Sequence, residues 1–500
     1  MTGKVEIQGF CDPKFEDVKD AFTRNFNEGM EVGASFAVMI NGKYVIDIWG
    51  GYKDKEKNQP WEKDTICNVY STTKVPTVIC TLMCVDRGFL DLDEKVATYW
   101  PEFAQNGKEN ILVRHLFSHT SGVAGVDETI PWSAWTDWDR IINLLAAQKP
   151  WWEPGTKSGY HMVTHGFLLG ELVRRVTGKT LGTFFKEEIA EPLNIDFHIG
   201  LPETHIPRVS NLVSAPPLME LISMIFGTIV KMANKSEKIQ KEIENLAKSI
   251  QFEFGDHKFG VIIKNGKLFF KKKPLDNIDC KFIATKDKAG VMLWLFSSIN
   301  DGADIVADHL KMEGNSEDID QVKKLFELIS TETRKMDSLI VKQFLNPLVI
   351  ADRSSDPAWR AAEIPAANGH GNARAVAKIA SIVACGGEID GTKFLSEETL
   401  EKMLEEQIHD TDLLLQVPIR WGLGVGLKSK FKPFPNDRTC FWGGAGGSSI
   451  NMDLDGKIGM GYVMNQMRNQ PMMETMKNKY HNDTRGNRLI TAVYEALGLI

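Results

Sequence analysis

The sequence has no long apolar run, no excess of basic residues and no Cys-x-x-Cys pair. Its longest uncharged apolar run is the ten residues 221–230, whereas a membrane-spanning helix needs about 18 or more. The 500 residues carry a net charge of −7, whereas nucleic-acid-binding proteins normally show a basic balance or a basic stripe. We therefore expect no transmembrane segment and no nucleic-acid partner.

Cysteine use indicates a reducing compartment, and the first residues show no targeting leader. The seven cysteines are an odd number and show no disulfide spacing. The first twenty residues contain five acidic residues and no apolar core, so neither a secretory nor a mitochondrial leader is evident. We expect a cytoplasmic protein, and the sequence leaves its oligomeric state open.

Composition and turn signals indicate a mixed globular fold. Apolar residues make up 43% and charged residues 25% of the chain, as in ordinary soluble domains. Asn41-Gly42 separates two β-rich runs, and this dipeptide is the strongest short hairpin signal. Further short β-rich runs occur between 422 and 464, and helical periodicity dominates between the two ends. We predict an α/β (α+β) fold, with an antiparallel sheet built from both ends of the chain, flanked by helices, beside a helical domain.

The middle of the chain has a different pattern of predicted helices and strands, which indicates an inserted module. It contains a charged amphipathic helix, a second Asn-Gly hairpin at Asn265-Gly266, short strands, a helix near 289–297 and a closing helix. About 100 residues is a normal domain size. We therefore predict a main domain in two parts, 1–232 and 334–500, interrupted by an α+β module over 233–333.

The strongest chemical signal is Ser71-Thr72-Thr73-Lys74 at the start of a predicted helix. Residues three apart share a helix face, so the Lys74 amine would lie one turn from the Ser71 hydroxyl. Serine is a weak nucleophile without an adjacent base, and a lysine can serve as that base if burial lowers its pKa. Taken alone, Ser71 is more often a helix-capping serine. Ser429 and Lys432 repeat the spacing, but Pro433 and Pro435 prevent a continuing helix there.

Three further segments accompany this signal. Pro154-Gly155-Thr156 is followed by Tyr160, whose phenol beside a lysine is a candidate general base. The segment 114–122 ends in His-Thr-Ser-Gly, and the segment 441–448 is a glycine-rich strand that lets backbone amides approach a ligand. Taken alone, a tyrosine is usually an amphipathic residue at the edge of a core.

Together, in this order and spacing, the motifs resemble the serine beta-lactamase-like superfamily, which includes class C beta-lactamases and family VIII carboxylesterases. The resemblance implies the beta-lactamase/transpeptidase-like fold. It also implies that Ser71 is the acylated nucleophile, that Lys74 and Tyr160 are the acid/base pair, and that the amides of Ser71 and Ala445 form the oxyanion hole.

Two departures from the superfamily pattern concern the substrate. Penicillin-directed members usually have Tyr-x-Asn, whereas this chain has Tyr160-His161-Met162. They also carry Lys-Thr-Gly on the late strand, where this chain has Trp442, Gly443 and Gly444, as the esterases do. An indole in place of a cation favours a small neutral ester over an anionic antibiotic, so the resemblance implies esterase rather than beta-lactamase activity.

The inserted module has a resemblance of its own. The order hairpin, strand, helix, then 310–315 and a closing helix at 322–326 is similar to sterol carrier protein 2 domains. That similarity implies a fatty-acyl or sterol ligand in the module. A purely structural elaboration is the equally weighted alternative.

Other active-site signatures are missing from the sequence. It has no Gly-x-Ser-x-Gly pentapeptide and no phosphate-binding loop. Two histidine pairs at i, i+4 lack a carboxylate at the expected offset, so we predict no metal site and no cofactor. The interpretation that remains is a serine hydrolase that cleaves carboxylic esters. An acyltransferase using the same site and a lipid-binding or scaffold protein with a vestigial site are the alternatives.

Overall fold

The chain forms two compact units. The computed structural model describes residues 5–213, 219–254, 257–284, 310–334, 339, 342–343, 346, 354–468 and 485–500. The larger unit comprises Met1–Gly125, Ser133–Ser214 and Asp352–Ile500, and the smaller comprises Val126–Trp132 and Ala215–Ala351.

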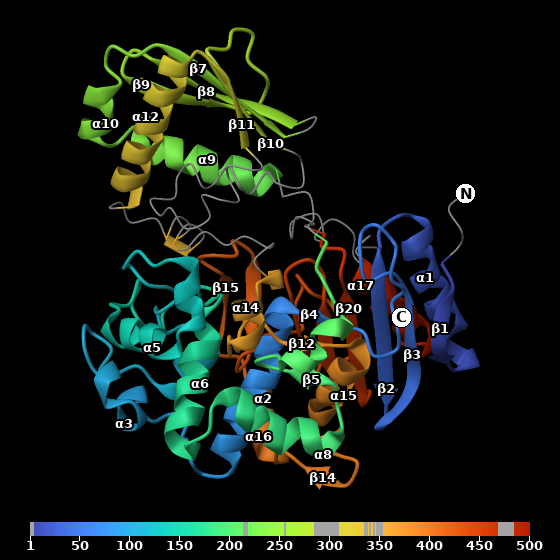
Figure 1. Cartoon of the computed structure of the whole chain (residues 1–500). Helices are drawn as coiled ribbons and strands as arrows, with labels where there is room; N and C mark the ends of the chain where they lie inside the picture. The colour runs from blue at the N-terminus through green and yellow to red at the C-terminus, as the bar shows by residue number, and fades with distance from the viewer. Residues whose placement is uncertain are drawn as a thin grey trace. The chain divides into compact units, whose positions relative to one another are not determined.

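A nine-stranded antiparallel sheet is the framework of the larger unit (Figure 1). Within it β2 (Gly33–Ile40) pairs with β20 (Ile458–Met464), so the sheet is built from both ends of the chain, as predicted. In spatial order the strands are β1 (Ile7–Cys11), β3 (Lys43–Gly51), β2, β20, β19 (Ser449–Asp453), β18 (Thr439–Gly443), β17 (Gly426–Leu427), β16 (Pro418–Trp421) and β15 (Ile408–Thr411).

The first hairpin has the predicted turn chemistry. Asn41 and Gly42 connect β2 to β3 with φ values of 51° and 75°. A type I′ turn needs positive φ at both central residues, which Asn and Gly adopt at little cost. This turn fixes the register of the two strands.

Helices cover both faces of the sheet. On one face α15 (Ala373–Ala384) lies close to β20, because a Cβ at Gly461 would come within 2.5 Å of the Ala373 carbonyl oxygen. Side chains alternate along a strand, so Met460 and Tyr462 point to the opposite face. There they share a buried apolar cluster with residues of α1 (Glu16–Asn27) and α17 (Arg485–Ala496).

The helical part is centred on α2 (Lys74–Asp86), in which every residue from Lys74 to Cys84 is buried. α6 (Thr164–Thr177) and α7 (Leu181–Phe185) pack against it, and α4 (Val113–Phe117) and α5 (Trp138–Ala147) pack against α6. A helix enclosed on all sides places its first side chains in an apolar setting. Lys74, the first residue of α2, therefore lies in such a setting.

The smaller unit is an α+β body with a five-stranded sheet. Its strands, in spatial order, are β11 (Leu310–Gly314), β10 (Cys280–Ala284), β7 (Lys248–Phe254), β8 (His257–Lys264) and β9 (Lys267–Lys271). Its helices are α9 (Met219–Ala233), α10 (Glu237–Glu242) and α12 (Ser316–Arg334). The unit begins earlier than the predicted module because Phe226 and Ile229 of α9 lie in the same core as the sheet. The helix predicted near 289–297 lies outside the described residues.

Phenylalanine rings fill much of the described core of this unit. Phe252 stacks on Phe259 and Phe282, with ring centroids 5.1 and 5.5 Å apart, and Phe226 meets Phe252 edge-on at 4.9 Å. Such spacings are ordinary aromatic packing distances. A fatty-acyl or sterol ligand in this unit stays a prediction. None of the helices in the described residues is both long and apolar enough to cross a membrane.

Candidate active site

The candidate nucleophile lies on a tight turn between a short buried strand and the central helix. β4 (Ile66–Asn68) leads into a 3-10 turn over Tyr70–Thr73, which continues as α2. Tyr70 has φ 43°, a left-handed conformation that is uncommon for a bulky residue. Residues three apart eclipse one another in a 3-10 turn, so Ser71 and Lys74 face the same way. Lys74 Nζ lies 3.2 Å from Ser71 Oγ.

Backbone carbonyls hold the Lys74 amine in place. Nζ donates to Met162 O at 2.6 Å and to Ala366 O at 3.0 Å. A neutral amine has two N–H donors and one lone pair. With both donors directed at carbonyls, the lone pair is left for the third neighbour, the Ser71 hydroxyl. In its neutral form the amine is therefore placed to accept the serine proton.

Burial favours the neutral form of this lysine. Lys74 is fully buried, and desolvation lowers its pKa well below the usual value for lysine. A neutral amine at working pH is what a lysine general base requires.

Tyr160 is the third member of the group. Its hydroxyl oxygen accepts a hydrogen bond from Trp442 Nε1 at 3.3 Å, and its ring lies 4.8 Å from Lys74 Nζ. Burial raises the Tyr160 pKa, although a hydrogen bond with the Ser71 side chain acts in the opposite direction. The phenol is therefore protonated at rest. Of the two candidate bases, burial leaves Lys74 neutral and able to accept a proton, whereas Tyr160 keeps its proton.

Three consecutive backbone amides anchor Tyr160. The Gly159 amide donates to His119 O at 3.0 Å, the Tyr160 amide to Asp412 Oδ1 at 3.0 Å and the His161 amide to His119 Nδ1 at 3.1 Å. His119 has φ 60°, which turns both its carbonyl and its ring towards this segment. The His-Thr-Ser-Gly segment thus positions Tyr160. Asp412, on the loop after β15, is a positioning residue that sequence reasoning missed.

Three neighbouring histidines are buried beside Tyr160. The His119 ring centroid lies 5.4 Å from that of His161 and 4.4 Å from that of His165, and burial lowers the pKa of all three, so they are neutral. His161 is fully engaged, with Ser121 Oγ and Gly159 O at 2.7 and 2.6 Å from its ring nitrogens. Within the described ranges no group of three or more His, Cys, Asp or Glu is arranged to hold a metal ion. These histidines act as packing and positioning groups.

The glycine-rich strand reaches the nucleophile turn through a tight turn of its own. After β18 ends, the Gly444 amide donates to Ser448 O at 2.8 Å and the Gly447 amide to Gly444 O at 3.1 Å. Gly446, the third residue, has φ 88°, as a type II turn requires. Ala445 occupies the second position, whose amide does not take part in the turn's own hydrogen bond. That amide is the candidate oxyanion donor predicted from the sequence.

Direct contacts join this turn to the segment that carries Ser71. A Cβ on Gly444 would come within 2.1 Å of Val69 O, so only glycine allows this approach. Ser448 Oγ donates to Val69 O at 2.7 Å and lies 3.0 Å from Thr72 Oγ1. Ser448 was also missed at the sequence level, because its role depends on a contact between segments almost 400 residues apart. The contacts place the 444–447 turn beside the turn that carries Ser71.

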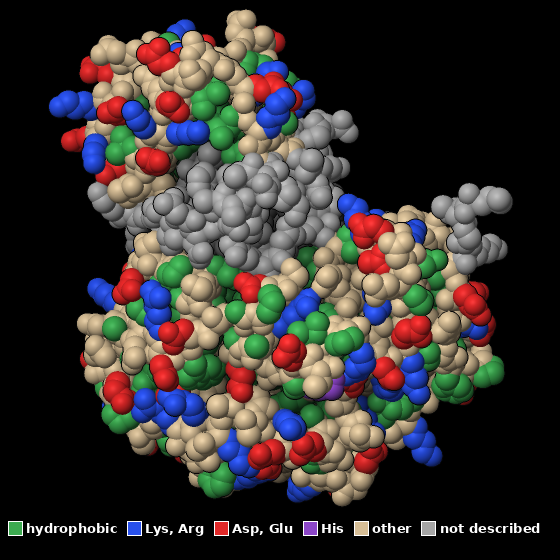
Figure 2. All heavy atoms as spheres, viewed as in Figure 1, with side chains coloured by type: hydrophobic (Ala, Val, Ile, Leu, Met, Phe, Trp, Pro, Cys, Tyr) green, Lys and Arg blue, Asp and Glu red, His purple; other side chains and the backbone are tan. Residues whose placement is uncertain are grey.

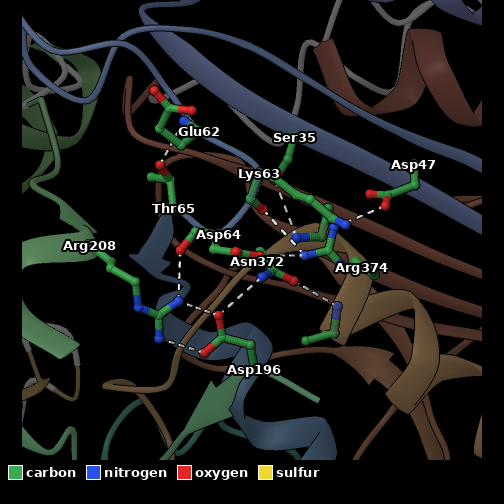
Figure 3. A network of polar contacts seen from close by, with 12 residues as sticks. Ser35, Asp47, Glu62, Lys63, Asp64, Thr65, Asp196, Arg208, Asn372 and Arg374 are labelled. Carbon is green, nitrogen blue, oxygen red and sulfur yellow. Dashed lines mark hydrogen bonds and ion pairs between the residues drawn. The ribbon is translucent and has the colours of Figure 1, made fainter. Parts of the chain in front are cut away.

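A polar network fixes the segment that precedes β4 (Figure 3). Arg374 at the start of α15 donates to Asp47 Oδ2 at 2.9 Å and to Asp64 Oδ1 at 3.1 Å. Arg208 links Asp64 O to Asp196. Burial would raise the Asp196 pKa, but hydrogen bonds from His198 and Arg208 outweigh it and lower that pKa. The network holds the base of the strand that presents Ser71.

The family model described as Beta-lactamase matches residues 22–224 and 337–481, more than half of the chain. The chain belongs to the beta-lactamase family. The stretch between the two matched segments, 225–336, falls within the smaller unit.

Several members of the beta-lactamase family are similar to this chain. It is 36% identical over 214 residues to Esterase/beta-lactamase LipL of Mycobacterium tuberculosis (strain ATCC 25618 / H37Rv) and 28% identical over 192 residues to Esterase EstB of Burkholderia gladioli. These alignments cover 41% and 35% of this chain, and the chain spans 48% of the length of each relative.

Solved structures of beta-lactamase-like proteins share the fold. The crystal structure of a family VIII carboxylesterase superimposes with a TM-score of 0.69 at 31% identity, covering 98% of this chain and 100% of that one. A penicillin-binding protein homologue from Caulobacter crescentus gives 0.68 at 27% identity, with the same coverage. The fold class predicted from the sequence is therefore confirmed.

Proposed function

We propose that this protein is a serine hydrolase that cleaves carboxylic esters through an acyl-enzyme formed on Ser71. The observation that carries the proposal is the fully buried Lys74 amine, 3.2 Å from Ser71 Oγ, with its two other polar contacts both made to carbonyl oxygens. The names of the relatives, two of them esterases, support the same reaction class.

In the proposed acylation step Lys74 takes the proton of Ser71, and the serine oxygen forms a bond to the acyl carbon. The amides of Ser71 and Ala445 donate to the resulting oxyanion. Tyr160 then gives its proton to the leaving alcohol as the ester bond breaks, and the Lys74 ammonium returns a proton to the phenolate. Lys74 Nζ lies 3.2 Å from Ser71 Oγ and 4.8 Å from the centre of the Tyr160 ring, which supports transfers within this group.

In the proposed deacylation step water attacks the acyl-enzyme. Neutral Lys74 accepts a proton from that water as its oxygen bonds to the acyl carbon, and the same two amides hold the oxyanion. The bond from the acyl carbon to the serine oxygen then breaks, and the Lys74 ammonium returns the proton to Ser71. The products are the carboxylic acid and the restored enzyme.

We propose that the substrates are neutral esters. Trp442 stands where penicillin-directed members carry a lysine, and its indole N–H is already directed at the Tyr160 hydroxyl. An indole cannot form an ion pair with a substrate carboxylate. Its apolar ring suits an uncharged acyl group.

Turnover of p-nitrophenyl acetate and butyrate tests the proposal. Ser71→Ala should abolish hydrolysis. Ser429→Ala is the matched control, since Ser429 has the same Ser-x-x-Lys spacing, and it should retain full activity. Hydrolysis that survives Ser71→Ala in a folded protein would contradict the proposal.

A further inference from the structure

Lysines are concentrated on and just after the β8–β9 hairpin of the smaller unit. Residues 231–284 contain 12 lysines and 7 acidic residues, a net charge of +5, so the rest of the chain carries −12. Lys264 and Lys267 flank the hairpin turn, Lys271 ends β9, and Lys272 and Lys273 follow it; all five are exposed.

Among the described residues, none of these five lysines has an acidic partner. Lysines elsewhere in the same sheet are paired: Lys258 and Lys281 both reach Glu253, and Lys311 reaches Glu313. In the part of the chain that the structure describes, no carboxylate lies within ion-pair distance of any of the five. Basic and acidic side chains both reach the face of this unit that Figure 2 shows, with apolar ones between them.

An exposed aromatic ring lies among the lysines. Phe269 is 44% exposed, although its neighbour Leu268 is buried. Side chains alternate along a strand, so Lys267, Phe269 and Lys271 point to the face away from the core. Cross-strand pairing adds Lys264 opposite Lys267 and the half-buried Ile262 opposite Phe269. We call Lys264, Lys267, Phe269, Lys271, Lys272 and Lys273 the lysine face.

Edge-strand protection explains only part of this pattern. β9 is the last strand of its sheet, and lysines on an edge strand prevent pairing with other chains. Protection of that kind does not need a large exposed ring. An aromatic side chain surrounded by lysines combines the two features that hold a protein at a bilayer surface: burial of apolar area at the interface and attraction to anionic headgroups.

We propose that the lysine face docks this protein on bilayers that contain anionic lipid. The lysine ammonium groups lie at the headgroup phosphates and carboxylates, and the Phe269 ring enters the boundary between headgroups and acyl chains. The association is peripheral and reversible, and it does not depend on the hydrolase proposal.

Vesicle co-sedimentation of the full chain tests this proposal. Phosphatidylcholine vesicles with about one-third phosphatidylserine should bind the protein, and pure phosphatidylcholine vesicles should not. Each lysine near an anionic surface is worth about fivefold in affinity, so K264E/K267E/K271E should lower binding more than about a hundredfold. Phe269→Ser should lower it about tenfold.

The matched control is K43E/K55E/K63E, which changes net charge equally at exposed lysines of the larger unit and should leave binding unchanged. Thermal unfolding of each variant verifies that it is folded. Equal binding to both kinds of vesicle, or undiminished binding of K264E/K267E/K271E, would overturn the proposal. Binding to an oligonucleotide without binding to vesicles would also overturn it, because it would assign the face to nucleic acid.

Discussion

At the scale of single residues, burial sets the protonation states of the site. Lys74 and Tyr160 share one apolar environment, and desolvation acts on them in opposite directions: it lowers the pKa of the amine and raises that of the phenol. Both effects favour the neutral pair over the charged one. Burial alone, without a carboxylate partner, therefore leaves an amine free of its proton beside a phenol that keeps its own.

The pH dependence of hydrolysis tests this assignment. Protonated Lys74 cannot accept the Ser71 proton, so kcat/KM should fall about tenfold per unit as pH drops below the lowered pKa of Lys74. Because the Tyr160 pKa is raised, its phenol stays protonated beyond pH 10, about the ordinary value, and we expect no alkaline loss from this group below that pH. Lys74→Arg should lower kcat by about 10²–10⁴ at every pH.

Lys432→Met is the control for the acid limb. Lys432 is the lysine of the second Ser-x-x-Lys segment, and burial lowers its pKa to about 8. If the acid limb moved in Lys432→Met and not in Lys74 variants, the base would have been assigned to the wrong lysine.

Side-chain motifs led to Ser71, Lys74, Tyr160 and Trp442, which the structure brings together. The carbonyl oxygens of Met162 and Ala366 could not be found in this way, because any residue supplies a carbonyl and only the path of the chain decides where it points. Asp412 was missed for a related reason. Its carboxylate reaches the Tyr160 amide from 252 positions away.

At the scale of elements, turn chemistry was the most reliable guide. Asn41-Gly42 and Asn265-Gly266 both form the predicted hairpins, since few residues other than Asn and Gly adopt positive φ at little cost. Helix starts were less precise. The sequence predicts a helix that starts with Ser71–Lys74, but the chain first makes a 3-10 turn over Tyr70–Thr73, and α2 begins at Lys74.

The turn after β18 gives a prediction at this scale. A Cβ at Gly444 would come within 2.1 Å of Val69 O and 2.3 Å of Ser448 Oγ, so Gly444→Ala must move the turn away from Ser71. Loss of the Ala445 donor should lower kcat by about 10²–10³. Gly443→Ala is the control, because its nearest contact is 3.2 Å from Ser448 O. Equal kcat in the two variants would show that the turn does not hold the oxyanion donor.

At the scale of the whole chain, a buried ion pair joins three distant segments of the larger unit. Arg485, at the start of α17, donates to Glu31 Oε2 at 2.7 Å and to Met30 O at 3.1 Å. It also donates to Gln466 O at 2.7 Å and to Gly446 O at 2.8 Å. Arg485 thus links the N-terminal segment at Met30 and Glu31 to Gly446, in the turn that carries Ala445.

Removing this arginine should destabilise the protein strongly. Arg485→Met leaves Glu31 buried without its cation, which typically costs about 3–5 kcal/mol. Arg438→Met removes an exposed pair with Glu401 and should cost about 1 kcal/mol or less. Urea unfolding measures both variants, and similar midpoints would show that the buried pair does not fasten the sheet.

The boundaries between the two units were harder to predict than their helices and strands. The sequence predicts a module over 233–333, whereas the smaller unit includes α9 and extends from Ala215 to Ala351, with Val126–Trp132 added from an earlier loop. The apolar sequence of α9 is compatible with the core of either unit. Only the side chains that it meets, here Phe252 and Phe259, decide which core it joins.

The central claim is that the buried amine of Lys74 activates Ser71 as the single nucleophile. Labelling the protein with a fluorophosphonate and mapping the adduct by mass spectrometry tests it most directly. The account predicts an adduct on Ser71 alone in the wild-type protein and at least a hundredfold slower labelling in Lys74→Met. An adduct on another serine, or undiminished labelling of Ser71 in Lys74→Met, would contradict it.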